Sequence, residues 1–129
     1  FAYPCGQTFV GREKTRRSYI PLISHLFAAG RGFLAETHAH PQWCDLAHLP
    51  ACWCDNVSAS ALFDRLDAAQ ADGGWLILAG HEVAPDPGYH NTLSSTLAAF
   101  CERLEVRSSG IWTAPVREIA GWVRTHRTG

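Results

Sequence analysis

A histidine that follows a buried strand is the residue of this chain best suited to chemistry. His81 comes directly after Gly80, which ends an unbroken apolar run over residues 75–79. Such a run, entered through the Gly73-Gly74 breaker, predicts a parallel strand buried on both faces. Catalytic groups gather at the carboxyl ends of parallel strands, and histidine is the side chain that most readily transfers protons near neutral pH. The sequence therefore predicts that His81 stands at a catalytic position. The alternative is a strand-end histidine bonded to a neighbouring carbonyl.

Two other strand ends carry polar groups that could act with this histidine. A carboxylate usually orients a catalytic histidine and stabilises its protonated form, and Asp55 could serve. A backbone N–H beside Tyr3, in the turn with Pro4 and Gly6, could face a developing oxyanion. The indole rings of Trp53 and Trp112 could stack on sugars, although tryptophans in an α/β domain are more often core residues.

The elements that must position these residues alternate along the chain. Short apolar runs predict strands at 1–3, 31–35, 49–54, 75–79 and 110–113. Apolar residues at helical spacing and capping residues predict helices near 18–30, 58–73, 91–104 and 115–127. In the first helix the residues expected to face the core are Tyr19, Leu22, Ile23, Leu26 and Phe27. This order predicts an α/β fold with a parallel sheet, or part of a βα barrel.

Composition limits both the fold and the partners. The 129 residues are 47% hydrophobic and 18% charged, which is typical of one globular domain. A formal net charge of −1 gives no electrostatic case for nucleic acid or an anionic membrane. No apolar run approaches the roughly 20 residues that span a bilayer. The chain contains no Met and starts within a strand candidate, so we expect a partial domain over 1–129.

Cysteine and histidine residues offer further chemistry. Six of them lie close together in the sequence and have the side chains that bind zinc: His38, His40, Cys44, His48, Cys52 and Cys54. Core thiols and loop histidines are the alternative interpretation. Cys5 and His81 could also form a nucleophilic pair, although a buried turn cysteine is the more ordinary interpretation.

Residues 1–6, Phe-Ala-Tyr-Pro-Cys-Gly, and residues 75–83, Trp-Leu-Ile-Leu-Ala-Gly-His-Glu-Val, resemble the polysaccharide deacetylase family (NodB homology), with Ile-Trp-Thr at 111–113 downstream. The resemblance covers the C-terminal half of that family's domain. It implies a distorted (β/α) barrel with seven strands, and metal-dependent hydrolysis of acetyl groups from a polymer such as chitin or peptidoglycan. By this resemblance His81 matches the general acid, Asp55 the aspartate that tunes it, and Tyr3 the tyrosine whose backbone helps hold the oxyanion.

The family's Thr-Phe-Asp-Asp and His-x-x-x-His motifs, which supply the base and the metal ligands, do not occur in the 129 residues. The resemblance therefore implies that a divalent metal, zinc by preference, is held by an N-terminal half. For this chain alone we expect no catalytic metal, no activity, and self-association or pairing with an upstream segment. The alternatives are a non-catalytic remnant that binds carbohydrate or a protein, and an unrelated α/β domain with a structural zinc.

Overall fold

The apolar run at residues 75–79 has one buried face and one partly buried face, so the predicted burial on both faces is confirmed only in part. In the computed structural model, which describes residues 1–106 and 110–128, Trp75, Ile77 and Ala79 are at most 6% exposed and lie in one hydrophobic core. Leu76 and Leu78 pack against a second core. Successive side chains of a strand point to opposite faces, so this run joins the two cores.

Parallel pairing connects consecutive segments of the chain. Strand β3 (Cys52–Trp53) pairs in parallel with β4 (Leu78–Ala79). Isolated parallel bridges join Ala2 to Arg31 and Arg31 to Leu49. Four successive segments thus lie side by side with the same direction, and their carboxyl ends share one edge. The predicted strand at 31–35 is reduced to the bridge at Arg31, and residues 49–54 and 75–79 form strands only over two residues each.

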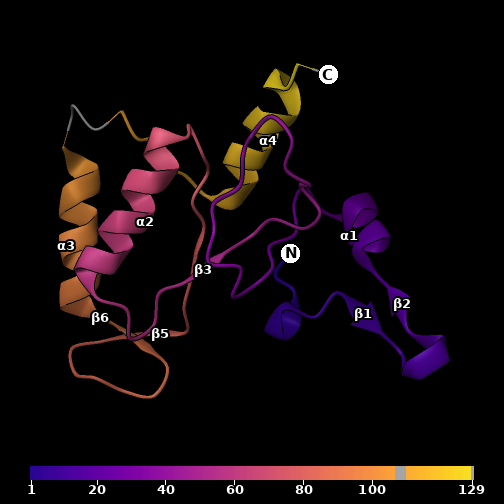
Figure 1. Cartoon of the computed structure of the whole chain (residues 1–129), viewed down its shortest axis with the longest axis horizontal. Helices are drawn as coiled ribbons and strands as arrows, with labels where there is room; N and C mark the ends of the chain where they lie inside the picture. The colour runs from indigo at the N-terminus through magenta and orange to yellow at the C-terminus, as the bar shows by residue number, and fades with distance from the viewer. Residues whose placement is uncertain (107–109, 129) are drawn as a thin grey trace.

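Helices cover both sides of this layer (Figure 1). Helix α2 (Ala59–Ala71) begins at Ser58, whose side chain accepts a hydrogen bond from the backbone of Ala61, and packs beside α3 (Ser94–Glu105). Their contact forms the second core, which contains Leu62, Leu66 and Phe100. Helix α4 (Val116–His126) closes the first core with Ala120 and Val123. These three helices confirm the predicted helices, except that α3 begins at Ser94 because residues 91–93, predicted to start it, form a strand.

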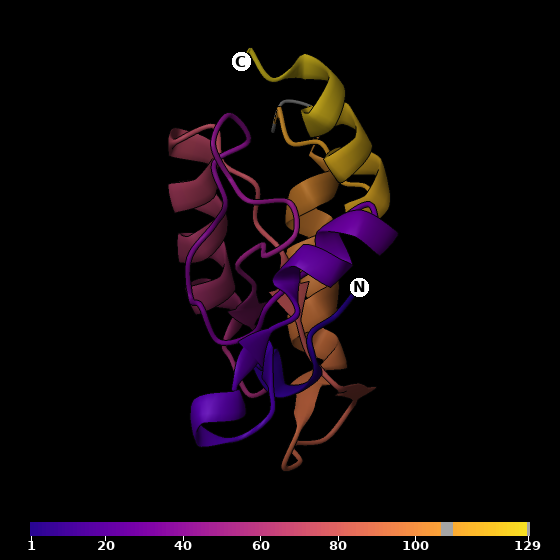
Figure 2. The ribbon, with the colours of Figure 1, turned by 90° about the vertical axis from the view of Figure 1, so that its right-hand side faces the viewer.

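The first helix departs from its prediction. Helix α1 spans only Ile20–Leu26, and within its expected core-facing stripe only Ile23 is buried. Leu22, Leu26 and Phe27 are exposed, so the predicted burial of these three side chains was wrong. The helix lies at the edge of the molecule (Figures 1 and 2), and the described residues place no layer over its outer side. Helical spacing defines an apolar face but does not provide a surface to cover it.

Four short strands were not predicted. Strands β1 (Phe9–Val10) and β2 (Arg17–Ser18) form an antiparallel pair between the predicted strand at 1–3 and helix α1. The 3₁₀ turns η1 (Pro4–Gly6) and η2 (Glu13–Thr15) flank β1. Strands β5 (Glu82–Ala84) and β6 (Asn91–Leu93) pair in parallel. They enter and leave a loop at the lower end of the molecule in Figures 1 and 2.

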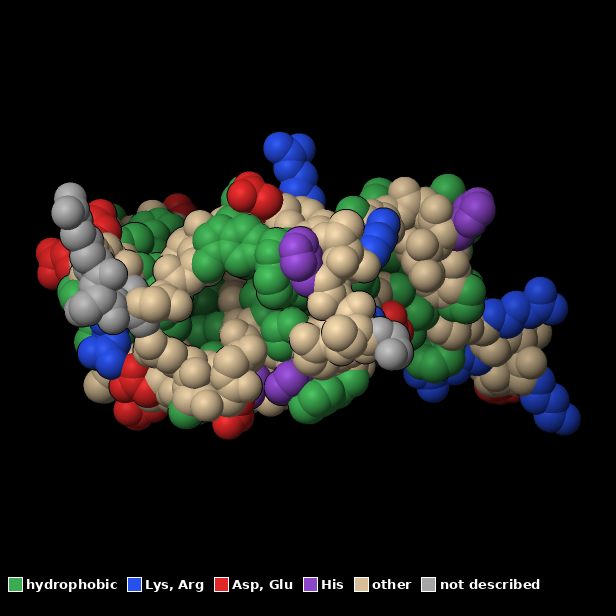
Figure 3. Space-filling view, turned by 90° about the horizontal axis from the view of Figure 1, so that it is seen from above, with side chains coloured by type: hydrophobic (Ala, Val, Ile, Leu, Met, Phe, Trp, Pro, Cys, Tyr) green, Lys and Arg blue, Asp and Glu red, His purple; other side chains and the backbone are tan. Residues whose placement is uncertain are grey.

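The strand predicted at 110–113 is absent from the structure of those residues. Instead they line an apolar cavity of about 700 Å³ between α2, α3 and α4. The side chains around it include Leu66, Ala69, Trp75, Phe100, Trp112 and Trp122. Figure 3 shows a hollow with hydrophobic side chains on the face seen from above. The predicted strand at 110–113 was therefore wrong, and these residues line the cavity instead.

The fold class is mixed α/β. Over residues 1–106 and 110–128 it has short parallel strand pairs and four α-helices, and the sheet does not close into a barrel. None of the helices in this described part is both long and apolar enough to cross a membrane.

Candidate functional site

Asp55 and His81 meet at the shared carboxyl edge of β3 and β4. The side-chain Nδ1 of His81 lies 2.8 Å from Oδ2 of Asp55. Asp55 is only 1% exposed, whereas the side chain of His81 is 54% exposed. Each residue lies two positions after the end of its strand, and parallel pairing brings the two together across 26 positions of sequence. The two residues that the sequence selected as an acid and its orienting carboxylate are therefore in contact.

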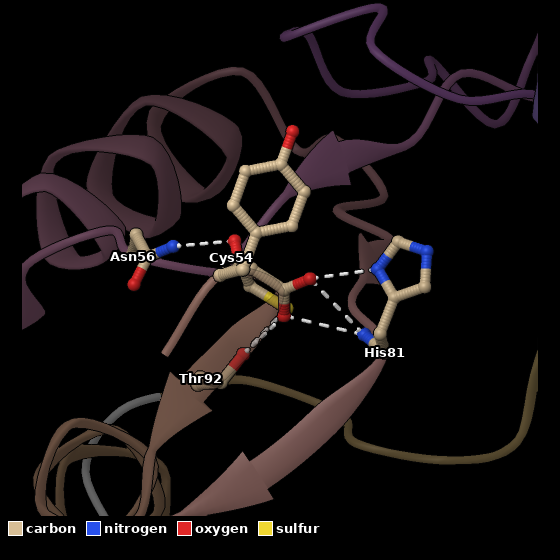
Figure 4. Close-up of polar contacts among 6 residues, drawn as sticks. Cys54, Asn56, His81 and Thr92 are labelled. Atoms are coloured by element: carbon tan, nitrogen blue, oxygen red, sulfur yellow. Dashed lines mark hydrogen bonds and ion pairs between the residues drawn. The ribbon is translucent and has the colours of Figure 1, made fainter. Parts of the chain in front are cut away.

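The carboxylate of Asp55 is held by several donors (Figure 4). The backbone N–H of His81 lies 3.2 Å from both oxygens, and the Thr92 hydroxyl donates to Oδ1 at 3.0 Å. Burial by itself would raise the pKa of Asp55. The hydrogen bonds from His81 and Thr92 outweigh burial, and the pKa of this carboxyl lies below its ordinary value. Asp55 is therefore an ionised acceptor at neutral pH.

This charge state fixes the tautomer of the histidine. An ionised carboxylate can only accept hydrogen bonds, so Nδ1 of His81 must carry a proton to bond to Oδ2. The ring presents its other nitrogen, Nε2, away from the carboxylate (Figure 4). With half of the side chain exposed, Nε2 is the atom that can exchange a proton with a substrate. The pair has the arrangement of an oriented general acid or base.

The lowered pKa of Asp55 predicts a specific dependence of stability on pH. A carboxyl whose folded-state pKa lies below its unfolded value of about 3.9 stabilises the fold fully above roughly pH 5. That contribution is lost as pH falls through the unfolded value and then through the lower folded-state pKa. We expect the free energy of unfolding, measured in urea from pH 6 to pH 3, to fall less steeply in Asp55→Asn than in the wild type. Equal slopes in the two proteins would contradict this assignment.

The register of β5 and β6 brings a second histidine to the site. Glu82 pairs with Asn91, so the residues that precede them, His81 and His90, lie side by side. Their ring centroids are 4.9 Å apart. The ring of Trp53 lies 5.1 Å from that of His81 and 5.8 Å from that of His90. Trp53, predicted to contact substrate, thus forms an aromatic wall beside the Asp55–His81 pair.

Asp55, His81 and His90 are also a group that could hold a metal ion. One ligand atom from each residue lies within 4.8 Å of the other two. Two imidazoles and a carboxylate are a donor set suited to zinc and related ions. Among the residues that the structure describes, no other His, Cys, Asp and Glu side chains form such a group. The structure does not identify a metal.

The turn after Tyr3 connects to the same edge of the sheet. A Cβ added at Gly6 would lie 3.2 Å from Phe33, whose ring packs 4.9 Å from that of Trp53. The backbone N–H of Tyr3 donates to Arg31 at 3.0 Å, and its hydroxyl donates to Ala47 at 2.6 Å. Tyr3 is therefore a buried residue whose amide belongs to the sheet.

In this turn the N–H group that has no acceptor among the described residues is that of the neighbouring Cys5. Pro4 has no N–H, and the N–H groups of Gly6 and Gln7 bond to carbonyls within the turn. Cys5 adopts a φ of 48°, in the left-handed region, which turns the backbone sharply at this point.

Trp112 is not part of this site. It packs 6.0 Å from Trp122 on the apolar cavity, whereas the site lies at the carboxyl ends of β3 and β4. In Figures 1 and 2, α4 lies at the upper end of the molecule and the β5–β6 loop at the lower end. The sequence grouped Trp53 and Trp112 because both are aromatic, but only Trp53 lies beside His81.

The Cys and His residues at 38–54 do not converge on one point. His38 pairs with Asp72 at 3.0 Å, and His40 stacks on Trp43 with ring centroids 3.4 Å apart. The remaining members have their own partners: Cys44 with Arg127, His48 with Tyr3, Cys52 with Thr37 and Cys54 with Thr92. The structural-zinc alternative lacks an assembled ligand set here. Among the described residues, the exposed Cys5 makes no contact with His81, so the structure does not assemble a Cys5–His81 pair.

The cysteines should differ in reactivity. Burial is the main cause that raises the pKa of Cys44, Cys52 and Cys54, and Cys5 and Cys101 are exposed. Since the thiolate is the reactive form, we expect iodoacetamide near neutral pH to label Cys5 and Cys101 first. Peptide mass spectrometry over time measures the order, and labelling in urea should equalise the rates. Early labelling of Cys52 or Cys54 in the native protein would contradict the burial described here.

Sequence reasoning missed His90 and Thr92. The sequence signal that could have indicated both residues is the loop with two prolines after His81. This loop ends at residue 90, where a new strand begins. Only the parallel register of β5 and β6 shows that this loop returns beside His81.

No protein-family model, curated protein or solved structure matches this chain.

Proposed function

We propose that this chain is part of a hydrolase that removes acetyl groups from a polysaccharide of the chitin or peptidoglycan kind. The observation that carries the proposal is the contact between buried Asp55 and half-exposed His81 at the carboxyl edge of parallel strands. In this reaction His81 is the general acid, and its Nε2 gives a proton to the leaving nitrogen or oxygen. Asp55 holds the ring in the required tautomer and stabilises the imidazolium before transfer.

The surroundings support a carbohydrate substrate. Trp53 stands beside His81 and is only half-buried, so its indole face can stack on a sugar ring. Tyr89 is 89% exposed on the loop next to His90. The free amide of Cys5, in the turn that packs through Phe33 onto Trp53, is our candidate donor to the oxyanion, in place of the amide of Tyr3.

The divalent metal of this reaction has no ligands assigned in this chain. The family motifs that hold it are absent from the sequence, and the proposed reaction uses Asp55 and His81 as a proton-transfer pair, which a metal bound between them would disrupt. The proposal requires that another part of the complete protein supplies the metal ligands. The finer fold assignment, part of a distorted (β/α)7 barrel, is also a proposal. The order of the parallel segments supports this assignment. The segments at Ala2, Arg31 and Leu49 and strand β4 lie side by side in the same order as in the sequence.

The test is release of acetate from acetylated chitin and peptidoglycan oligomers by the complete protein. We expect acetate release that depends on added zinc. Binding of the oligomers without acetate release would favour the second class of function, a carbohydrate-binding remnant, for which the exposed Tyr89 and Trp53 are suitable contacts. If the protein neither binds the oligomers nor releases acetate, both proposed functions are contradicted.

A further inference from the structure

We propose that Asp55, His81 and His90 form a binding site for a zinc-class divalent ion, distinct from the metal that the proposed hydrolysis requires. One ligand atom from each of the three lies within 4.8 Å of the others. Two atoms that bind one zinc ion at about 2.1 Å each can be at most about 4.2 Å apart. Closure therefore needs movements of about an ångström, and both histidines are exposed and can rotate.

The backbone already aligns the two histidines. His81 and His90 each precede one residue of the Glu82–Asn91 pair, so the parallel register holds them side by side. The loop between them is fastened at its return: Asn91 donates to the carbonyl of Asp86 at 2.7 Å, and Asn56 donates to the carbonyl of Tyr89 at 3.1 Å. Zinc binding therefore needs side-chain rotation but no rearrangement of the strands.

The carboxylate is positioned in the way that metal ligands usually are. Oδ1 of Asp55 accepts from the Thr92 hydroxyl, and the backbone N–H of His81 reaches both oxygens. Such outer hydrogen bonds fix the orientation of a ligating carboxylate. Oδ2 faces the histidines, with His81 Nδ1 at 2.8 Å. A metal between these atoms would replace the proton that they share.

The donor set selects the class of ion. Imidazole nitrogens suit zinc, copper, nickel and iron, whereas Mg²⁺ and Ca²⁺ prefer sites made only of oxygen ligands. Three protein ligands leave a fourth position for water, as in open zinc sites. We therefore expect binding of Zn²⁺ and Co²⁺, and no competition from millimolar Mg²⁺ or Ca²⁺.

His90→Ala is the decisive variant. Within the described residues His90 makes only ring contacts and is exposed, so its removal should leave the fold, checked by circular dichroism, unchanged. After chelator treatment, the complete protein is titrated with Zn²⁺ against a chromogenic chelator. At zinc concentrations where the chelator competes, we expect the wild-type protein to bind one more equivalent of Zn²⁺ than the His90→Ala protein. Loss of a ligand should weaken this site by more than the roughly 10–100-fold that loss of an outer hydrogen-bond partner causes.

The matched control is His38→Ala. His38 also lies near a carboxylate, that of Asp72, but it is not part of the proposed zinc site. This variant should bind as the wild type does. Co²⁺ should give visible bands of nitrogen and oxygen ligation that His90→Ala removes. The proposal would be overturned by equal zinc binding in the wild type and His90→Ala, or by loss of binding in His38→Ala alone. It would also be overturned by a thiolate band in the near ultraviolet that His90→Ala leaves intact. None of these readouts depends on acetate release, so this site and the proposed hydrolysis are tested separately. Zinc bound between Asp55 and His81 would displace the proton that this pair transfers, so occupation of this site would inhibit the proposed hydrolysis.

Discussion

Replacement of His81 by Ala should reduce acetate release by the complete protein about 10²–10⁴-fold, the usual loss when a positioned acid or base is removed. The reason is the geometry at the site. Nδ1 is held by a buried carboxylate, which leaves Nε2 as the proton donor on the exposed side. The measurement is the steady-state rate of acetate release from an acetylated oligosaccharide. We expect the loss in kcat rather than in KM, because the proton is transferred in the transition state.

His25→Ala is the control for this variant. His25 is an exposed histidine on α1, a helix outside the candidate site, so its removal should leave the rate unchanged. Circular dichroism and urea unfolding establish that the His81 variant is folded. A folded His81→Ala protein with near wild-type kcat would remove His81 from the mechanism. Equal losses in both variants would show that the effect does not belong to the site.

Gly80→Ala should lower both stability and activity. A Cβ at this position would lie 2.7 Å from Oδ1 of Asp55 and 2.7 Å from Sγ of Cys54. It would also approach Thr92 Oγ1 to 3.2 Å. The carboxylate cannot move away without losing its hydrogen bonds to Thr92 and His81. We expect the free energy of unfolding to fall by about 1–3 kcal/mol, the usual cost of overpacking, and acetate release to fall with it.

Gly121→Ala is the matched substitution with the opposite expected sign. Gly121 lies within α4, and a Cβ there would meet nothing within 4 Å. Alanine is favoured over glycine in a helix interior by about 1 kcal/mol, so this variant should be more stable. Urea unfolding of both variants measures the difference. A Gly80→Ala protein as stable as the wild type would show that Gly80 does not pack against the carboxylate as described.

The sequence by itself determined the strand–helix elements with strong local signals. The apolar run at 75–79 predicted a strand covered on both faces. A capping residue, Ser58 or Ser60, placed the start of α2, and the structure puts the cap at Ser58. His81 and Asp55 could be selected because both follow strand candidates, and carboxyl ends of parallel strands meet. These predictions depend on neighbours within a few residues, where hydrophobic periodicity and capping decide the structure.

Only the tertiary structure decided which side chains meet and which apolar faces are covered. The register of β5 and β6 brought His90 to His81, and residues 110–113 line the cavity beside α4 instead of forming a strand. Helix α1 kept its helical spacing but left most of its apolar stripe exposed. Likewise, the N–H of Tyr3 donates to the carbonyl of Arg31 in the sheet, whereas the N–H of Cys5 has no acceptor among the described residues. The physical reason is that register and coverage depend on segments far apart in the chain, which local spacing does not encode.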